Sequence, residues 1–148
     1  MILLDTNLLT RMTHARDPQA GVARSAVQAL LTRGERLIVV PQNMYEFWAV
    51  ATRRPGAPPA GQNGLGMTPA QAGQWVRFFQ RRFAFLPDHD QLSKVWLTLV
   101  EAHGITGFRA HDVRLVAAMQ CYGITRLMTF NAAHFRGLPI TVLDPASP

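Results

Sequence analysis

The sequence has one cysteine, one lysine and no long uninterrupted run of hydrophobic residues. With Cys121 alone, the chain cannot form an internal disulfide, and its apolar neighbours in LVAAMQCYGI favour a small buried side chain over a nucleophile. No apolar stretch approaches the roughly 20 residues that a membrane-spanning helix needs. The first residues also lack the basic region and long apolar stretch of a secretory signal. We therefore expect a cytoplasmic protein that does not associate with a membrane.

Acidic residues are scarce, with 9 Asp and Glu against 15 Lys and Arg, which gives a formal net charge of +6. Lys94 is the only lysine, so nearly all the positive charge is carried by arginine. Arginine suits bidentate recognition of phosphate, although a genome composition that favours arginine explains the same bias. Hydrophobic residues make up 48% of the 148 residues, which excludes disorder and predicts a single domain spanning 1–148.

Short apolar segments and helical patterns alternate along the chain. The expected strands are MILL (1–4), RLIVVP (36–41), AFLP (84–87), RLMTF (126–130) and ITVLDP (140–145). The first strand does not alternate apolar with polar residues, which is typical of a parallel sheet covered on both faces. The order of elements predicts an α/β fold with three α/β/α layers and a mainly parallel central sheet of about five strands.

Helix-capping residues mark where several of the intervening helices should begin. Asp17, Thr68 and Asp88 are expected as N-caps. The expected helices begin just after Asp5 and cover 17–34, 42–54, 68–83, 88–104 and 110–123. The segment 55–66, PGAPPAGQNGLG, is rich in proline and glycine and is expected to be a mobile surface loop.

Polar side chains follow or approach the ends of the expected strands. Asp5 ends the first strand, Glu46 lies about one turn into the helix after the second, and Asp112 opens the helix before the fourth. Asn131 follows the fourth strand directly. In parallel sheets, functional groups gather beyond the carboxyl ends of the strands. Clustered carboxylates repel one another unless a cation joins them, and Mg²⁺ or Mn²⁺ prefers such oxygen ligands and can serve phosphodiester hydrolysis.

Each of these carboxylates also has an ordinary structural explanation. Asp5 alone could cap the helix that follows it. Glu46 could lie on the surface, although Phe47 and Trp48 beside it must be buried nearby. Asp112 could be a first-turn residue that the helix dipole favours. The presence of all three at matching positions favours a metal site over three unrelated explanations.

Four segments in order resemble the PIN domain of VapC-type toxins. They are LLDTN at the start, the Tyr-Glu pair within PQNMYEFWAV, GFRAHDVRLVAA, and LMTFNAAHF followed by ITVLDP. The resemblance covers essentially the whole chain, and four pieces with suitable spacing are more specific than any one alone. It implies a metal-dependent endoribonuclease that uses Mg²⁺ or Mn²⁺, cleaves RNA and is usually paired with an antitoxin protein.

The resemblance assigns Asp5, Glu46 and Asp112 to the acidic triad that binds metal and performs catalysis. Asn131 falls where many members carry a fourth acid, and His134 falls where related chains often carry aspartate before phenylalanine. Both departures remove negative charge, so they weaken the expectation of a second metal ion.

Several neighbouring residues could support the acidic triad. Thr6 and Asn7 could orient Asp5 or a substrate phosphate, and a role in helix entry explains them equally well. Thr129 could orient Asp112 or a water molecule at the metal, although a threonine in a strand needs no function.

Arg109 could bind RNA phosphate or neutralise the acidic cluster, with a solvated loop arginine as the alternative. We interpret His111 as structural. Large apolar side chains between Met44 and Phe83 exceed what one helix stripe needs, which favours a homodimer face or an antitoxin groove. A basic rim for RNA is a further possibility, with solvated helix faces as its alternative: Arg53, Arg54, Arg77, Arg81 and Arg82.

Two other functions fit parts of the sequence. The first is a catalytically weakened PIN-fold module that binds RNA or a protein, with Asn131 and His134 as traces of lost chemistry. The intact triad argues against it. The second is an aspartyl-phosphate phosphatase, which also begins with an aspartate at a strand end. That enzyme would need a second aspartate two residues later, where Asn7 stands, and a suitably placed lysine, whereas Lys94 is alone.

Overall fold

The computed structural model describes residues 1–56 and 64–148, so most of the predicted loop 55–66 lies outside the described residues. Five strands form one sheet in the order β3-β2-β1-β4-β5, and all four pairings are parallel. The strands are β1 (Ile2–Leu4), β2 (Leu37–Val39), β3 (Ala84–Phe85), β4 (Arg126–Met128) and β5 (Thr141–Leu143). The predicted three-layer α/β/α fold with a parallel central sheet is confirmed.

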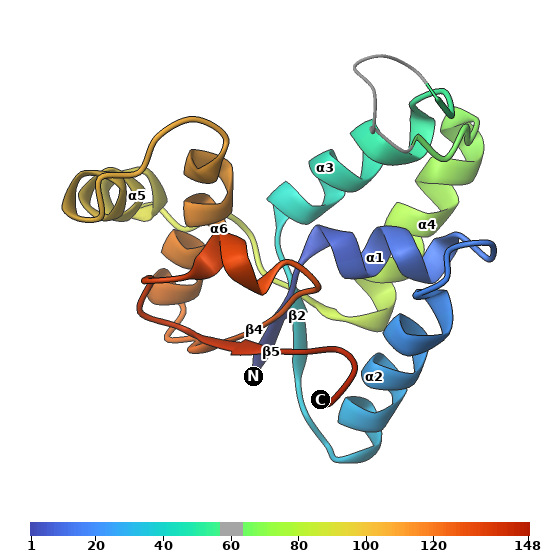
Figure 1. Cartoon of the computed structure of the whole chain (residues 1–148), viewed down its shortest axis with the longest axis horizontal. Helices are drawn as coiled ribbons and strands as arrows, with labels where there is room; N and C mark the ends of the chain where they lie inside the picture. The colour runs from blue at the N-terminus through green and yellow to red at the C-terminus, as the bar shows by residue number, and fades with distance from the viewer. Residues whose placement is uncertain (57–63) are drawn as a thin grey trace.

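Six α-helices cover the two faces of the sheet in the described residues (Figure 1). They are α1 (Thr6–Thr13), α2 (Ala20–Thr32), α3 (Pro41–Thr52), α4 (Pro69–Arg82), α5 (Leu92–Ala102) and α6 (Arg109–Cys121). A short 3₁₀ helix, η1 (Ala132–Phe135), follows β4 and was not predicted.

Two hydrophobic cores lie on opposite faces of the sheet because successive strand residues point to opposite sides. Ile2 and Leu4 of β1 pack into one core with α1, α2, α3 and α4, whereas Leu3 packs into the other with α5 and α6. All three residues of β1 are fully buried. The uninterrupted apolar strand is therefore the sequence signature of a sheet that is covered on both sides.

Two of the predicted helix caps are wrong. α2 begins at Ala20, and Asp17 instead accepts a hydrogen bond of 2.7 Å from a backbone N–H in the turn before that helix. α5 begins at Leu92 without a side-chain cap, because the Asp88 carboxylate accepts a hydrogen bond of 2.7 Å from Arg114 of α6. Asp88 thus has a stronger partner elsewhere in the fold, whereas Asp17 bonds within its own turn, and both helices begin later than predicted.

The predicted start of α4 is confirmed. Thr68 is the N-cap, its hydroxyl accepts a hydrogen bond of 3.2 Å from the Gln71 N–H, and Pro69 occupies the first helical position. Cys121 is only partly buried rather than buried, and this burial raises the pKa of its thiol, which disfavours the thiolate. Within residues 1–56 and 64–148, no helix combines the length and the apolar character needed to cross a membrane.

Candidate active site

A pocket of about 550 Å³ lies at the carboxyl edge of the sheet. It is lined by Asp5 directly after β1, by Glu46 of α3 and by Asp112 of α6, together with Asn131 and His134 beyond β4. The three predicted carboxylates thus come from three separate elements and meet in one pocket because the parallel strands all end at the same edge. Glu46 reaches this pocket from the second turn of α3, and Asp112 reaches it from the first turn of α6.

Asp5 is the most buried of the three carboxylates. Its Oδ2 atom accepts hydrogen bonds from the Thr129 hydroxyl at 2.5 Å and from the Asn7 amide at 2.7 Å. Burial raises the pKa of Asp5 from its usual 3.8 to about 6, opposed by the Thr129 hydrogen bond and reinforced by the charges of Glu46 and Asp112. The pocket therefore holds a carboxylate that pays a large desolvation penalty when it is ionised.

Glu46 is held at both of its carboxylate oxygens. Its Oε2 atom accepts a hydrogen bond of 2.7 Å from the Thr6 hydroxyl, and its Oε1 atom accepts one of 2.6 Å from the Gln42 amide. Asn43, which is fully buried, donates to the Thr6 hydroxyl at 3.2 Å and to the Leu4 carbonyl at 3.0 Å. These bonds tie the start of α3 to the end of β1, directly before Asp5.

Asp112 is paired with a histidine. Its Oδ2 atom lies 3.3 Å from Nδ1 of His134, which stands in the 3₁₀ helix after β4. Burial raises the pKa of Asp112, the charge of His134 lowers it, and the charge of Glu46 raises it. The role of His134 could not be predicted, since the pairing depends on how η1 folds back towards α6.

The supporting residues differ in part from their predicted contacts. Asn7 contacts Asp5 as predicted, whereas the Thr6 hydroxyl bonds to Glu46 and the Thr129 hydroxyl bonds to Asp5 rather than to Asp112. β1 pairs with β4, and this places Thr129 next to Asp5.

Arg109 and Asn131 flank this network. The Arg109 guanidinium donates hydrogen bonds of 3.3 Å to the backbone carbonyls of His134 and Arg136. It therefore supports the segment after β4, and its predicted contact with RNA phosphate stays a prediction. The Asn131 side chain lines the pocket, while its backbone N–H donates to the Thr129 hydroxyl at 2.9 Å.

Gln42 is a residue of the site that was not predicted. Its side chain is buried and contacts Glu46, the His111 carbonyl and Arg114. A glutamine four residues before Glu46 on the same helix would place it on the same face, which is the signal that could have revealed it. His111 lines the pocket, and its backbone carbonyl takes part in this network, which agrees with a structural role.

The donor atoms of the pocket fit a hard divalent cation. Three carboxylates line it, and hydrogen bonds in the described residues fall on Oδ2 of Asp5 rather than on Oδ1. Burial raises the pKa of Asp5, and the charges of Glu46 and Asp112 raise it further, so a cation bound beside it would favour the ionised form of Asp5. Within residues 1–56 and 64–148, however, no three His, Cys, Asp or Glu side chains already stand close enough to hold a metal between them. Water ligands, which Mg²⁺ commonly retains, would complete the site.

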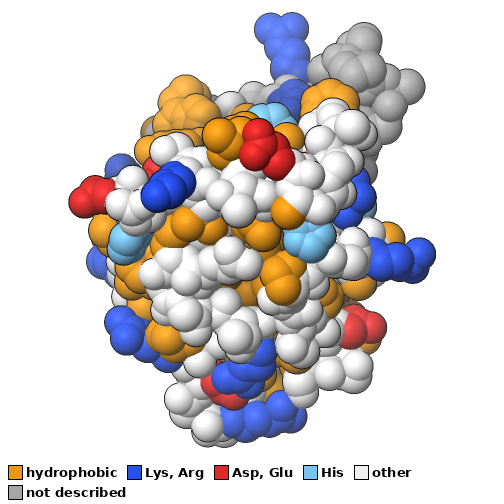
Figure 2. All heavy atoms as spheres, turned by 90° about the vertical axis from the view of Figure 1, so that its left-hand side faces the viewer, with side chains coloured by type: hydrophobic (Ala, Val, Ile, Leu, Met, Phe, Trp, Pro, Cys, Tyr) orange, Lys and Arg blue, Asp and Glu red, His pale blue; other side chains and the backbone are white. Residues whose placement is uncertain are grey.

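A second hollow of about 500 Å³ lies between α5 and α6, and we call it the α5–α6 hollow. Trp96 and Leu92 form its apolar wall, and Asp88, His111 and Arg114 contribute polar groups. Figure 2 faces this side of the molecule, where hydrophobic side chains lie among acidic, basic and histidine side chains. His111 lines both this hollow and the acidic pocket, so the two are neighbours.

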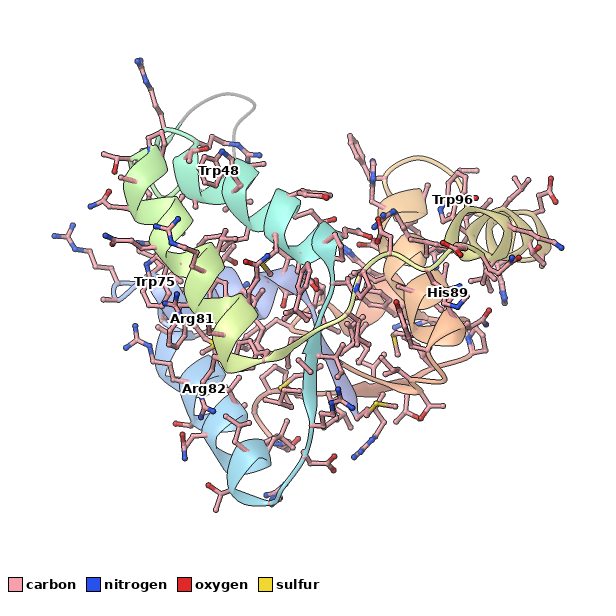
Figure 3. All side chains as sticks on the ribbon, turned by 180° about the vertical axis from the view of Figure 1, so that it is seen from behind. Trp48, Trp75, Arg81, Arg82, His89 and Trp96 are labelled. Carbon is pink, nitrogen blue, oxygen red and sulfur yellow. The ribbon has the colours of Figure 1, made fainter. Side chains whose placement is uncertain are left out.

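The aromatic helices lie on the other side of the molecule. In Figure 3, Trp48 on α3 and Trp75 on α4 lie away from His89 and Trp96. Phe79 is fully buried in the core, whereas Trp48 is 40% exposed and Phe78 is 39% exposed. Core packing therefore does not use all the aromatic surface of α3 and α4.

A sheet of this order, covered by helices on both faces and carrying an acidic pocket at its carboxyl edge, defines a PIN-like fold. No protein-family model matches the chain, and a search of curated proteins finds no match to its sequence either.

Several solved structures share the fold over nearly the whole chain. A toxin–antitoxin complex from Klebsiella pneumoniae is 18% identical with a TM-score of 0.68, and the match covers 100% of each chain. VapBC-1 from nontypeable Haemophilus influenzae is 18% identical with a TM-score of 0.66, covering 99% of this chain and 100% of the other. VapC20 from Mycobacterium tuberculosis, a sarcin–ricin loop cleaving toxin, is 17% identical with a TM-score of 0.65, covering 95% and 97%. These similarities establish the fold.

Proposed function

We propose that the chain is a metal-dependent endoribonuclease and the toxin of a type II, VapBC-like toxin–antitoxin pair. The observation that carries the proposal is the meeting of Asp5, Glu46 and Asp112 in one pocket at the carboxyl edge of the sheet. The shared fold supports it, because VapC20 is described as a toxin that cleaves the sarcin–ricin loop. We expect this activity in the cytoplasm.

The residues of the pocket have distinct parts in the proposed reaction. Asp5, Glu46 and Asp112 would hold Mg²⁺ or Mn²⁺, which when bound supplies Lewis-acid chemistry to phosphodiester hydrolysis. Asn7 and Thr129 fix the Asp5 carboxylate through hydrogen bonds to its Oδ2 atom.

The rim of the pocket offers groups that suit RNA. Arg53 and Phe108 line it, and Phe108 is 90% exposed. An arginine can bind a phosphate, and an exposed aromatic ring can stack on an unpaired base. Together they would place a single-stranded or looped segment of RNA over the carboxylates, while the net charge of +6 favours association with a polyanion.

Cleavage of structured RNA by the purified protein tests the proposal. Cleavage should need Mg²⁺ or Mn²⁺, stop with a chelator, and be lost in Asp5→Asn. Glu101→Gln is the matched control, because Glu101 is an exposed carboxylate on α5 outside the pocket. Chelator-resistant cleavage, or full activity in Asp5→Asn, would refute the metal-nuclease function.

A catalytically weakened RNA- or protein-binding module is the alternative. Two observations favour it: in the described residues the carboxylates are not already arranged around a common metal position, and His134 occupies one side of Asp112. This alternative predicts RNA binding with unchanged affinity in Asp5→Asn and no cleavage by the wild-type protein with either metal ion.

We further propose two protein partners, a cognate antitoxin and a second copy of the chain. Toxin–antitoxin complexes are among the structures that share the fold, which supports the antitoxin. The exposed Trp48 and Phe78 support a homodimer through α3 and α4. Light scattering that shows only monomer over a wide concentration range would contradict the homodimer, and an upstream partner that fails to inhibit cleavage would contradict the antitoxin.

A further inference from the structure

Gln42 is a buried polar side chain in the first turn of α3, one helical turn before Glu46. Its exposed fraction is 6%, so each of its polar atoms needs a partner within the protein. The side-chain Nε2 donates to Glu46 Oε1 at 2.6 Å and to the His111 carbonyl at 2.9 Å. The side-chain Oε1 accepts from Arg114 at 3.0 Å. All three bonds join α3 to α6 or to the acidic pocket.

The chemistry of these partners fixes the orientation of the Gln42 amide. An arginine can only donate, so the amide oxygen must face Arg114. A backbone carbonyl can only accept, so the amide nitrogen must face His111 and, beside it, Glu46. A flipped amide would leave the Arg114 donor and the His111 carbonyl without suitable partners. Arg114 and the His111 carbonyl together therefore determine that Gln42 presents an N–H to Glu46.

The N–H of Gln42 is the hydrogen-bond donor for one of the two carboxylate oxygens of Glu46. Thr6 holds Oε2 at 2.7 Å, and Gln42 holds Oε1 at 2.6 Å, so the two donors together fix the rotation of the carboxylate. With Thr6 alone, the carboxylate could turn about its terminal torsion, which is broad for an sp³–sp² bond. A metal ligand that must first be ordered binds more weakly than one that is already held.

We propose that Gln42 is the positioning residue for Glu46 in metal binding, and that Arg114 acts on the acidic pocket through Gln42. This inference rests on the proposed function, since it assigns Glu46 to the metal site. Neither Gln42 nor Arg114 lines the acidic pocket. Both therefore act on the reaction indirectly, and Glu46 is the pocket residue whose side chain Gln42 contacts.

The same chain of contacts extends to the α5–α6 hollow. Arg114 lines that hollow and donates at 2.7 Å to Asp88, which lines it too. Asp88, Arg114, Gln42 and Glu46 thus form a continuous line of hydrogen bonds from the hollow to the acidic pocket. A change in the hollow that moves Arg114 away from Gln42 would therefore affect Glu46 through two hydrogen bonds, Arg114–Gln42 and Gln42–Glu46.

Three variants test this inference. Gln42→Leu removes the amide with little change in volume, and Arg114→Met removes the guanidinium but keeps the apolar stem. Arg126→Met is the matched control, because Arg126 also makes a close pair with a carboxylate, Glu35, at 2.7 Å, but at the opposite end of β4. The readouts are Mg²⁺ affinity by calorimetry, the Mg²⁺-induced shift in melting temperature, and kcat and KM for RNA cleavage.

Gln42→Leu should weaken Mg²⁺ binding and lower kcat by about tenfold or more, with KM for RNA nearly unchanged. Arg114→Met should act in the same direction but less strongly, and Arg114→Lys should recover part of the loss because one donor remains. Arg126→Met should leave all these quantities unchanged apart from a lower melting temperature. In the double variant, the effect of Arg114→Met should vanish, since its route through Gln42 is already gone.

Several results would overturn the inference. Mg²⁺ affinity and kcat within twofold of wild type in folded Gln42→Leu would show that Glu46 needs no second donor. Additive effects in the double variant would show that Arg114 acts by another route. If Gln42→Leu does not fold, Arg114→Met and Arg114→Lys decide the question by the same readouts. A wild-type protein that neither binds Mg²⁺ nor cleaves RNA would refute the proposed function, and the inference with it.

Discussion

The Thr129 hydroxyl donates a hydrogen bond of 2.5 Å to Asp5 Oδ2, which joins two residues 124 positions apart in the sequence. The two side chains meet because β1 pairs with β4 and each residue directly follows its strand. Asn7 donates to both of them, at 2.7 Å to Asp5 and at 2.8 Å to Thr129. Asp5 is thus held by a network that crosses the centre of the sheet.

Asp5→Asn should stabilise the metal-free protein at neutral pH. The folded state raises the pKa of Asp5 from 3.8 to about 6, so it binds the proton more tightly than the unfolded state does. Stability from this group is therefore fully present below about pH 4 and is lost as the pH rises through 6. The asparagine does not ionise and avoids the loss, which amounts to about 3 kcal/mol at most.

Denaturant unfolding in the presence of a chelator, from pH 4 to pH 8, measures this effect. The free energy of unfolding of the variant should increase relative to that of wild type as the pH rises. This difference should level off above about pH 7. Glu101→Gln, which changes an exposed carboxylate, should show no such trend. If Asp5→Asn exceeds wild type in stability most strongly at pH 4, Asp5 is not a desolvated carboxylate.

Thr129→Val should reduce cleavage by about tenfold, and Thr129→Ser should largely restore it. The valine keeps the shape of the side chain but removes the hydroxyl that donates to Asp5. Because this hydrogen bond lowers the pKa of Asp5, its loss should raise that pKa further. The pH at which cleavage reaches half its maximum should therefore move upwards in Thr129→Val. An unchanged pH profile would indicate that Thr129 is merely a core residue.

The sequence predicted the acidic pocket and the contact of Asn7 with Asp5, but not the other contacts within the pocket, for a physical reason. Asp5, Glu46 and Asp112 could be found because each stands at a strand end or in an early helical turn, and a parallel sheet brings such positions to one edge. The hydrogen-bond acceptor of the Thr129 hydroxyl could not be predicted, because it depends on which strand lies beside β1. The order of strands in the sheet cannot be read from the sequence. The sequence suggested Asp112 or a water molecule at the metal as the partner of Thr129, whereas the sheet order places Thr129 beside Asp5.

The start of α4 was predicted because local chemistry decides it, and the start of α5 was missed because a tertiary contact decides it. Thr68 caps α4 through the N–H of Gln71, three residues further along the chain. Asp88 has a guanidinium within 2.7 Å, supplied by Arg114 from another helix. A charged partner of this kind binds an aspartate more strongly than a backbone N–H, so the capping prediction at Asp88 fails.

Phe108→Ala should weaken RNA binding by at least about fivefold, through the loss of stacking on a base. Phe108 is 90% exposed and lines the acidic pocket, which is where an unpaired base beside the cleaved phosphate would lie. Phe78→Ala is the control, because Phe78 is a partly exposed aromatic residue on α4 that does not line this pocket. The measurement is KM for cleavage together with RNA affinity in the chelated protein. Equal losses in both variants would indicate a general effect of apolar surface.

Asn131→Asp should tighten Mg²⁺ binding, whereas Asn131→Ala should change it little and Asp112→Asn should weaken it strongly. The Asn131 side chain lines the pocket beside the three carboxylates, but a neutral amide contributes little to the affinity for a cation. An aspartate there adds a fourth negative charge, which a divalent ion attracts and which the other carboxylates repel. Asn131→Asp should therefore be less stable than wild type in chelator. Its melting temperature should rise more than that of wild type when Mg²⁺ is added, because a ligand that binds only the native state stabilises that state. Calorimetric titration and thermal melts at pH 8, which lies above the pKa of about 6 of Asp5, measure both effects. If Asn131→Asp binds Mg²⁺ no more tightly than wild type, the cation does not sit among these four side chains, and the acidic pocket is not the metal site.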